Sequence, residues 1–532
     1  MALDALRGFT GPKSTTRVFD ILMISLSQLN RINEAVQVLY QMKELPAVQA
    51  FNCLLNGMLR LGTYDSVWKL FDEMLHRGVQ PNVFTYNILI NTCRFQDDIE
   101  KGIFLMEEMV AKRINPTVHT YTILICSFCE NGDVRGAIKM FKRMKESGVR
   151  PNLYTYNALM DGHFKNANVE EALALYGKMI ENRLMPNDVS FATLIDGLCK
   201  FGRISDARKM FLIDMARYGV LPTVPIYNCL IDGYCKLGNL DEPFKLYTEM
   251  RKAGLIPDAV TYGILIKGLC NAKRVQEAAD LLSKMRQDGV LANSVIYNTI
   301  TDGYCKEGDL KKAMETCSRM TDEGIEPNLI TFSTLIDGHC KKGEMETAMG
   351  VYTEMVTKGF EPDIVTYTTL IDGYTRYGIL DKAFSLEKEM VEKDVPPNVV
   401  TNTCLINGLC REGLTRDAIN LYVKKTSASD FKPNEKTYMA LIYGLYRAGQ
   451  YFKAGRFYLS MRMSGFVPDV VTYLVLMRGQ CQMGYVLNAM MLQADMLKTG
   501  AMPEEWYIAC PDGWSFVFDR RSVERKFVVQ TL

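Results

Sequence analysis

The chain has 532 residues, and its 62 Lys and Arg residues nearly balance 61 Asp and Glu residues, so the net charge is +1. This balance excludes a global basic field, and any nucleic-acid site must therefore depend on the local placement of charge. No apolar run approaches the length of a membrane span, and no secretory signal is visible.

Residues 1–15 are expected to form an N-terminal segment without a clear transit peptide, and helical hairpins are expected to follow from residue 16. The segment 329–363 shows the pattern. Apolar residues recur at i, i+3 and i+4 over its first half and again over its second half. Gly343 is expected to end the first helix, and Gly359 with Pro362 the second.

The same hairpin recurs along the chain, with Pro327, Pro362 and Pro397 spaced by 35 residues. Such periodicity predicts an all-α solenoid of about 14 helix-turn-helix repeats of 35 residues over residues 16–504. The repeats are expected to begin at residues 16, 48, 83, 118, 153, 188, 224, 259, 294, 329, 364, 399, 435 and 470.

Two repeats are one residue longer than the others. The extra residue of 188–223 falls in MFLIDM, inside a helix, where a bulge is expected. That of 399–434 falls near KKTSASDFKPN, in a Ser-rich connection. Residues 505–532 break the pattern and are expected to cap the last hairpin, being too short for a catalytic domain.

Fifteen cysteines suggest disulfides, but most of them share one repeat position near the end of the first helix. The set comprises Cys129, Cys199, Cys235, Cys270, Cys305, Cys340, Cys410 and Cys481. Free cysteine as a small core residue is the favoured interpretation, and free thiols indicate a reducing compartment.

Segments such as VTYGILIKGLC, VTYTTLIDGYTRYG and YNCLIDGYCKLGNLDEPFKLYTEM resemble the pentatricopeptide repeat over nearly the whole chain. The uniform repeat length is similar to the P-class of that family, and runs of near-identical VTY repeats are similar to its plant fertility-restorer-like subgroup. The resemblance implies a right-handed superhelix. It also implies a non-catalytic protein without cofactors, located in mitochondria or alternatively in plastids. Such a protein acts in RNA stabilisation, processing or translation, where protein partners supply any catalytic step.

Position five of each repeat follows a recurring Tyr or Phe that faces the core, so position five is expected to face a groove. The residues at position five and at the last position are mostly Asn, Asp, Ser and Thr. Helix capping explains the last position, but it does not explain polar residues inside the next helix, where they are mediocre helix formers. Such side chains are suited to hydrogen bonds with unstacked RNA bases.

In the family these two positions form a base code. The resemblance assigns a pyrimidine, with cytosine preferred, to Asn52/Asn82, Asn157/Asn187 and Asn298/Asn328, a pyrimidine to Asn87/Thr117, adenine to Thr122/Asn152, Thr368/Asn398 and Thr403/Asn434, guanine to Ser333/Asp363, and uracil to Asn228/Asp258. The repeats beginning at 16, 188, 259, 435 and 470 have no assigned base.

Two further positions complete the expected RNA surface. Position two, which flanks the base in the family, holds Val189, Val260, Val295, Ile330, Val365 and Val400. Position thirteen carries cations. They could contact RNA phosphates or compensate the helix macrodipole, and the sequence favours neither role over the other. They are Arg60, Lys165, Lys200, Lys236, Lys306, Lys341, Arg376, Arg411 and Arg447, and Phe95 and Glu130 interrupt them.

Catalytic and metal sites are not expected. His163 and His339 share position eleven on the core side of the first helix, which favours core residues over ligands. No zinc-deaminase motif, carboxylate cluster or Gly-rich phosphate loop is present. The alternative function is a protein-binding scaffold of the tetratricopeptide type, but a protein-binding groove does not require the polar residues at position five.

Overall fold

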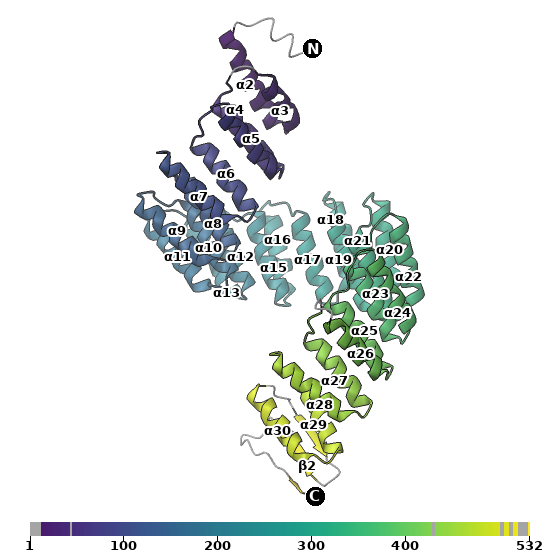
Figure 1. The fold of residues 1–532 in the computed structure, drawn as a ribbon. Coiled ribbons are helices and arrows are strands. Elements are labelled where there is room, and N and C mark those ends of the chain that lie inside the picture. Colours follow the sequence, from purple (N-terminus) through teal and green to yellow (C-terminus); the bar gives the residue numbers. More distant parts are fainter. Residues whose placement is uncertain are drawn as a thin grey trace. The chain divides into compact units, whose positions relative to one another are not determined.

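The structure is a computed structural model that describes residues 12–42, 45–427, 431–500, 505–509, 514–519 and 530–531, with side chains from residue 17 to residue 500. The chain divides into two compact blocks, an N-terminal block of residues 1–268 and a C-terminal block of residues 269–532. The division falls inside helix α17 (Ala259–Asn271). Each block is a stack of helical hairpins (Figure 1).

In the N-terminal block, successive first helices pack against each other, and each also packs against its own second helix. The first helices are α2 (Pro12–Gln28), α4 (Val48–Arg60), α6 (Val83–Phe95), α8 (Val118–Glu130), α10 (Leu153–Lys165), α12 (Asp188–Lys200) and α15 (Val224–Lys236). The second helices are α3 (Ile32–Gln41), α5 (Tyr64–His76), α7 (Ile99–Ala111), α9 (Val134–Glu146), α11 (Val169–Glu181), α13 (Ile204–Lys209) with α14 (Met215–Arg217), and α16 (Asp241–Lys252).

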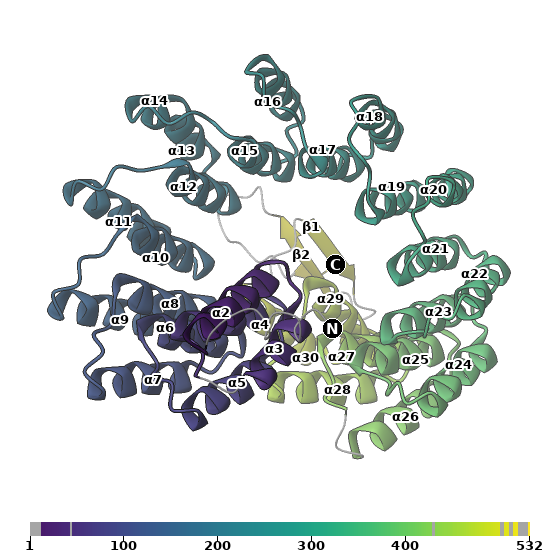
Figure 2. The same ribbon diagram turned by 90° about the horizontal axis from the view of Figure 1, so that it is seen from above.

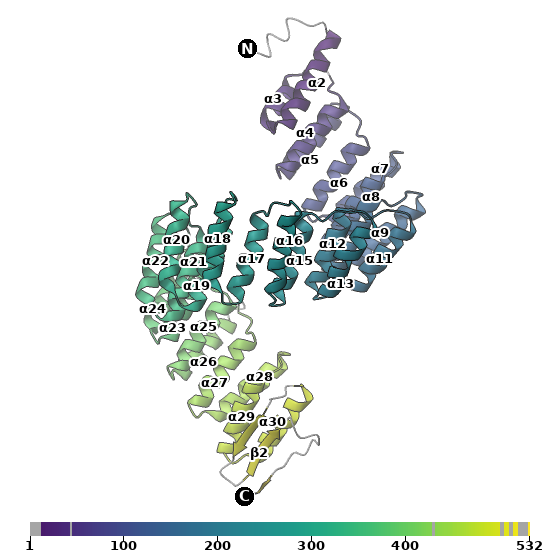
Figure 3. The same cartoon turned by 180° about the vertical axis from the view of Figure 1, so that it is seen from behind.

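The C-terminal block repeats this arrangement (Figure 3). Its first helices are α19 (Ser294–Glu307), α21 (Leu329–Lys342), α23 (Ile364–Arg376), α25 (Val399–Arg411), α27 (Glu435–Arg447) and α29 (Val470–Gln482). The second helices are α18 (Val275–Gln287), α20 (Leu310–Asp322), α22 (Met345–Thr357), α24 (Leu380–Glu392), α26 (Thr415–Ser427), α28 (Tyr451–Met463) and α30 (Val486–Lys498). In each block the first helices lie on the inner side of the stack and the second helices on the outer side (Figure 2).

The predicted all-α repeat architecture is confirmed, and the hairpin 329–363 ends where expected. Gly343 caps α21 in the left-handed conformation at φ +87°, which glycine adopts without steric cost. The extra residue in MFLIDM forms a π-helical turn, η1 (Met210–Asp214), as predicted. Helix α2 begins four residues before the expected repeat start at residue 16. The connection that holds the other extra residue includes residues 428–430, outside the described ranges.

The C-terminal tail contains a small sheet that the repeat pattern did not predict. Strands β1 (Glu505–Ala509), β2 (Trp514–Asp519) and β3 (Gln530–Thr531) are antiparallel in the order β1-β2-β3, with Glu505 opposite Asp519. β1 contacts α29, so part of the tail does lie against the last hairpin. The rest of residues 505–532 lies outside the described ranges.

The core is a repeated layer of the same few side chains. Tyr at position four and Met at position 27 are fully buried in most repeats, for example Tyr367 and Met355. Cysteines at position twelve are packed against a glycine at position ten of the next repeat, where a Cβ on Gly373 would lie 2.9 Å from Cys340 Sγ. Burial raises the pKa of thiols such as Cys199 and Cys340 to about 12, so they are protonated at neutral pH.

These cysteines are small packing residues, as predicted, and all but one of the predicted set are free. Cys481 is the correction, because it is disulfide-bonded. Cys481 shares its repeat position with the free cysteines, so the sequence period could not distinguish it from them. Among the described helices, none has the length and apolarity needed to cross a bilayer.

Candidate nucleic-acid interface

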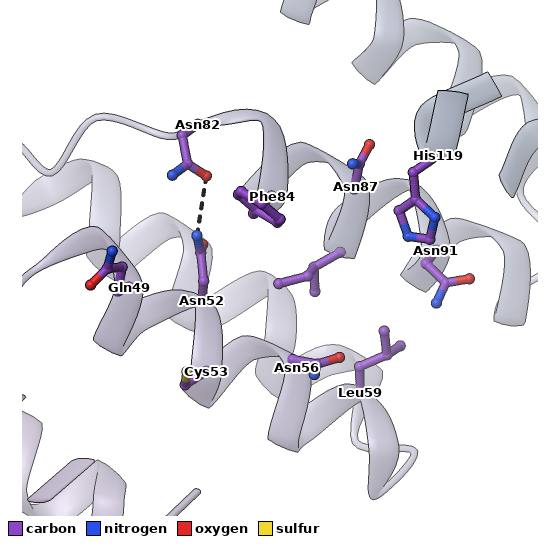
Figure 4. Close-up of a pocket in the computed structure, with 11 residues that line it drawn as sticks. Gln49, Asn52, Cys53, Asn56, Leu59, Asn82, Phe84, Asn87, Asn91 and His119 are labelled. Atoms are coloured by element: carbon purple, nitrogen blue, oxygen red, sulfur yellow. Dashed lines mark hydrogen bonds between the residues drawn. The ribbon is translucent and has the colours of Figure 1, made fainter. Parts of the chain in front are cut away.

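The predicted base-reading residues lie side by side along the inner helices. We call position five of a repeat and its last residue the reader pair. In the pair Asn52/Asn82, the Asn52 Nδ2 donates a hydrogen bond of 3.1 Å to Asn82 Oδ1 (Figure 4). Asn228 donates in the same way to Asp258 Oδ1 at 3.3 Å, and Asn298 donates to Asn328 Oδ1 at 3.3 Å. Each of these three pairs therefore forms one polar unit between two successive first helices.

The last residue of a reader pair is also the N-cap of the next first helix. Asn328 Oδ1 accepts the backbone N–H of Thr331 at 3.1 Å, and Asp363 Oδ1 accepts that of Thr366 at 2.8 Å. The last residue therefore caps the helix, which was the alternative explanation of this position. The cap uses only one side-chain atom. Within the described residues, Nδ2 of Asn328 and Oδ2 of Asp363 have no hydrogen-bond partner. An Asn cap therefore leaves a donor available, and an Asp cap leaves an acceptor.

Where position five is Thr or Ser, its hydroxyl reaches the cap only through a hydroxyl of the next repeat. Thr368 Oγ1 lies 2.7 Å from Thr401 Oγ1, and Thr401 Oγ1 lies 3.1 Å from Asn398 Oδ1. Ser333 Oγ lies 3.0 Å from Thr366 Oγ1. The two members of such a pair are therefore bridged rather than directly bonded.

The two members of the predicted adenine pair Thr403/Asn434 are not directly bonded to each other. Thr403 Oγ1 donates to the Val399 carbonyl at 2.7 Å and lies 2.7 Å from Thr437 Oγ1, while Asn434 Oδ1 accepts the Thr437 N–H at 3.0 Å. No bond joins Thr403 to Asn434 among the described residues. Because a hydroxyl has one proton, which Thr403 donates to the Val399 carbonyl, its oxygen can offer a ligand only a lone pair.

In the predicted adenine pair Thr122/Asn152, the position-five residue is buried, although position five was expected to face a groove. Thr122 Oγ1 lies 2.8 Å from the Val118 carbonyl and 2.8 Å from Thr155 Oγ1, and Asn152 Oδ1 accepts the Thr155 N–H at 3.0 Å rather than bonding Thr122. Thr122 is only 2% exposed, whereas Asn152 is exposed. A threonine is shorter than an asparagine and folds back onto its own helix, so Asn152 supplies most of the accessible polar surface of this pair.

Two pairs with Asn at position five are also not directly bonded. Asn87 accepts the Thr120 hydroxyl at 2.7 Å, while Thr117 bonds Thr120 rather than Asn87. Asn157 is buried and its Oδ1 has no partner in the described structure, whereas Asn187 caps α12 through Ser190. Both position-five residues nevertheless occupy the same place in the repeat as the bonded ones.

Among the reader pairs with an assigned base, Asp258 is the ionisable residue with a resolved pKa shift, and it is held as a carboxylate. Partial burial of Asp258 opposes ionisation, but the hydrogen bonds from the Thr261 N–H, the Thr261 hydroxyl and Asn228 outweigh this effect and lower its pKa. Asp258 is therefore ionised at neutral pH and can act only as an acceptor.

The predicted flanking residues form an exposed apolar row beside the reader pairs. Val295 is 66% exposed, Ile330 63% and Val365 59%, and Val189, Val260 and Val400 are similarly exposed. Apolar side chains left in water at regular spacing indicate a contact surface. The structure adds two residues that were not predicted, Phe84 and Tyr154, which occupy the same position and are 70% and 60% exposed. Their register alone would have identified them.

A pocket of about 520 Å³ lies between α4 and α6 and combines these features (Figure 4). Asn52, Asn82 and Asn87 supply polar groups, and Phe84 and Ile88 supply apolar surface. His119, from the start of α8, lies at the far side. Amide groups beside an exposed aromatic ring are the elements needed to hydrogen-bond and stack an unpaired base.

The position-thirteen cations are exposed, but six of the nine are paired with Asp one turn earlier in the same helix. Lys306 Nζ lies 2.6 Å from Asp302, Lys341 Nζ 2.5 Å from Asp337, and Arg376 2.7 Å from Asp372. Lys165, Lys200 and Lys236 are paired in the same way with Asp161, Asp196 and Asp232. Arg60, Arg411 and Arg447 form no ion pair with described residues. We call the position-thirteen cations the cation stripe. Their Asp partners were not predicted from the sequence.

One interruption of the stripe has a structural reason. Glu130, at position thirteen, accepts a bidentate pair from Arg94 of the preceding repeat, with Arg94 Nε 2.6 Å from Glu130 Oε2. The Arg94 guanidinium lowers the pKa of the Glu130 carboxyl. The negative charge of Glu130 is therefore neutralised by Arg94.

The two histidines at position eleven are buried, as predicted, each 4% exposed. His339 Nδ1 lies 2.9 Å from Glu344 Oε2, while Nδ1 of His163 has no partner in the described structure, and burial lowers the pKa of that imidazole. In the described ranges, no group of three or more His, Cys, Asp or Glu side chains is placed to hold a metal ion.

Comparison with known proteins establishes the family. The profile of the PPR repeat family matches residues 46–94, 154–200, 222–271, 292–341, 330–376, 362–411 and 433–482, more than half of the chain. The pentatricopeptide repeat domain profile matches residues 104–166. The chain therefore belongs to the pentatricopeptide repeat family.

Its relatives share single stretches of repeats. Pentatricopeptide repeat-containing protein At5g61400 of Arabidopsis thaliana is 40% identical over 90 residues, which cover 17% of this chain and 14% of that protein. The mitochondrial pentatricopeptide repeat-containing protein At2g15630 of the same plant is 31% identical over 78 residues, 14% of this chain and 12% of that protein. The match to each thus spans less than a fifth of the relative.

Among solved structures, the pentatricopeptide repeat protein PPR10 in complex with an 18-nt psaJ RNA element is similar with a TM-score of 0.49 and 20% identity. The match covers 94% of this chain and 83% of that one.

Proposed function

We propose that the chain binds single-stranded RNA, with one base contacted by each reader pair. The observation that carries the proposal is the chemistry left free by the caps. The cap bonds consume the same oxygen in every Asn or Asp cap, so Asn presents an NH₂ donor and Asp presents a carboxylate acceptor at the same place. This difference distinguishes bases by the atoms of their Watson–Crick edges.

The free groups suit the bases assigned from the family. Uracil and guanine carry a ring N–H, which the free oxygen of Asp258 or Asp363 accepts. Cytosine and adenine carry an unprotonated ring nitrogen at the equivalent place, which the amide of Asn328 or Asn398 can bond. A position-five Thr whose proton is engaged, as in Thr403, adds an acceptor for the amino group of adenine.

The proposed role is binding alone, in organellar RNA stabilisation, processing or translation, with other proteins supplying any catalytic step. Two relatives are named as mitochondrial, one from Arabidopsis thaliana and one from Schizosaccharomyces pombe. They support an organelle as the location and favour the mitochondrion over the plastid.

The pocket beside Phe84 offers the test of the binding surface. Replacing Phe84 by Ala removes an exposed ring that lines the reader pocket, and stacking on such a ring is worth roughly 1–3 kcal/mol per base. We expect Phe84→Ala to weaken a single-stranded RNA carrying the bases assigned to residues 48–187 by at least about fivefold in a fluorescence titration. Phe104→Ala is the matched control, because Phe104 is 63% exposed but lies on the outer helix α7. Equal affinity of the two variants would contradict the proposed surface.

The ion pairs of the cation stripe provide two tests of whether its lysines contact RNA phosphates, one expected to weaken binding and one expected to strengthen it. We expect Lys306→Ala with Lys341→Ala to weaken every RNA about equally and to flatten the plot of log affinity against log salt by roughly 1.4, since each phosphate contact on a single strand contributes about 0.7. Asp302→Asn with Asp337→Asn leaves the same lysines without their counter-charges and should strengthen binding. If the lysine variant has an unchanged salt slope, these residues serve only the helices.

A further inference from the structure

A third residue contacts both members of most reader pairs. It is the Thr at position three of the following repeat, which is completely buried and so cannot touch a base. In the C-terminal block, Thr331 Oγ1 lies 2.7 Å from Asn298 Oδ1 and 3.1 Å from Asn328 Oδ1. In the N-terminal block, Thr261 Oγ1 lies 2.7 Å from Asn228 Oδ1 and 2.9 Å from Asp258 Oδ1.

The hydroxyl decides which way the reader amide faces. Because Thr331 Oγ1 donates to Asn298 at the shorter distance and accepts the Asn328 N–H at 3.1 Å, Asn298 must turn its oxygen toward Thr331. Its Nδ2 is then directed toward Asn328 and the groove. Without the hydroxyl, the amide can rotate by half a turn and present an acceptor where it now presents a donor.

The sequence pairs the two positions in every repeat with an assigned base. Every assigned position-five residue is followed by a hydroxyl residue at position three of the next repeat, namely Thr85, Thr120, Thr155, Ser190, Thr261, Thr331, Thr366, Thr401 and Thr437. Where position five is Ala192 or Gly263, the corresponding residue is Ile226 or Ile296. Met439 is an exception, because Thr472 follows it at the capped start of α29. In the other repeats from residue 48 onward, a hydroxyl residue at position three accompanies a polar residue at position five of the preceding repeat.

In the repeat 153–187, the position-five residue Asn157 has no hydrogen bond from the hydroxyl residue that follows it. After Asn157 the hydroxyl residue is Ser190, whose Oγ bonds Asn187 Oδ1 at 2.9 Å, and Asn157 Oδ1 is buried with no partner in the described structure. Serine lacks the β-methyl that restricts the χ1 rotation of threonine, so its hydroxyl is not held toward position five. The side chain of Asn157 is therefore not oriented as Asn298 is, although both belong to Asn/Asn pairs.

We propose that the position-three Thr is a positioning residue that sets base specificity by orienting the reader amide. The repeat 153–187 consequently accepts cytosine and uracil nearly equally, while the repeat 294–328 prefers cytosine. This inference rests on the proposed RNA binding and makes that function more specific, because it separates two repeats whose reader pairs are identical.

The test is a reciprocal exchange in the full chain, measured with RNAs that carry C or U at one place. Thr331→Ser should lower the ratio of cytosine to uracil affinity at repeat 294–328 toward one, from at least about fivefold. Ser190→Thr should raise that ratio at repeat 153–187 by a similar factor. Thr331→Val, which keeps the shape and removes the hydroxyl, should act as Thr331→Ser does.

The readout is a ratio at one base, which a general loss of stability does not change selectively. Preference for guanine at Ser333/Asp363 is the internal control and should be unaltered. Unchanged ratios in both exchanged proteins would overturn the positioning role while leaving RNA binding intact. If the unsubstituted protein prefers guanine at repeat 329–363 but no base at repeat 294–328, the positioning role alone fails. Absence of any base preference in the unsubstituted protein overturns the proposed function and this inference together.

Discussion

The double substitution Thr368→Asn with Asn398→Asp is expected to change the base preferred by repeat 364–398 from adenine to uracil. It recreates the pair Asn228/Asp258 in a site that already holds the third residue, since Thr401 occupies the place of Thr261. Asn398 Oδ1 caps α25 through the Val400 and Thr401 N–H groups at 2.9 Å, and Asp caps equally well, so the fold should be retained. Base-edge contacts discriminate between bases by about 1–3 kcal/mol. Because the preference is reversed, the difference in binding free energy between adenine and uracil should change by about twice that amount.

The measurement is a binding titration of both proteins against RNAs that differ only at that base. Thr368→Asn alone is the matched control, because it creates an Asn/Asn pair and should prefer a pyrimidine with cytosine favoured. Guanine at the neighbouring pair Ser333/Asp363 should remain preferred in all three proteins. If the double variant still prefers adenine, the assignment of the reader pair is wrong.

The substitution Gly444→Ala is expected to destabilise the C-terminal block by about 3 kcal/mol, the upper part of the range for overpacking. A Cβ at this position would lie 2.5 Å from Cys410 Cβ, 2.6 Å from its Sγ and 3.2 Å from its backbone Cα. Since the backbone of α25 cannot rotate away as a side chain can, α25 and α27 must separate. The loss should appear as a lower urea midpoint of helical circular dichroism.

Gly350→Ala is the matched control, because Gly350 also lies inside a helix, α22, and an added Cβ would meet no atom within 4 Å. Alanine costs less conformational entropy than glycine in a helix, so this variant should be more stable by roughly 0.5–1 kcal/mol. A loss of stability equal to that of Gly444→Ala would contradict close packing on Cys410 as the reason for glycine at position ten.

The fold was predictable because the 35-residue sequence period determines the positions of its helices. The phase of Tyr, Gly and Pro identifies the two helices of each hairpin, and the extra residue at MFLIDM produces a π-helical turn, as an insertion inside a helix should. The small sheet of the tail was not predicted, since residues outside the period have no such template. The disulfide of Cys481 was not predicted either, because this cysteine occupies the same repeat position as the free ones.

The candidate site was predictable in its positions but not in its bonds. The polar character of position five indicated a reader, yet which atom of Asn328 remains free depends on the cap that it makes with Thr331. Likewise, position nine contains Asp302 and Asp337, but only the three-dimensional structure shows these carboxylates pairing with the stripe lysines. Side-chain hydrogen bonds between adjacent repeats arise from packing distances that sequence spacing does not specify.

The most direct measurement is selection of RNAs from a random single-stranded pool by the whole protein, followed by sequencing. We expect enrichment of the run pyrimidine-G-A-A assigned to repeats 294–434, read 5′ to 3′ in the chain direction that the family resemblance implies. The run pyrimidine-pyrimidine-A-pyrimidine, assigned to repeats 48–187, should be enriched on its 5′ side. Of these pyrimidines, the one assigned to repeat 153–187 should be the least biased toward cytosine. Recovery of unrelated sequences, or retention of the pool without enrichment, would contradict base recognition by the reader pairs.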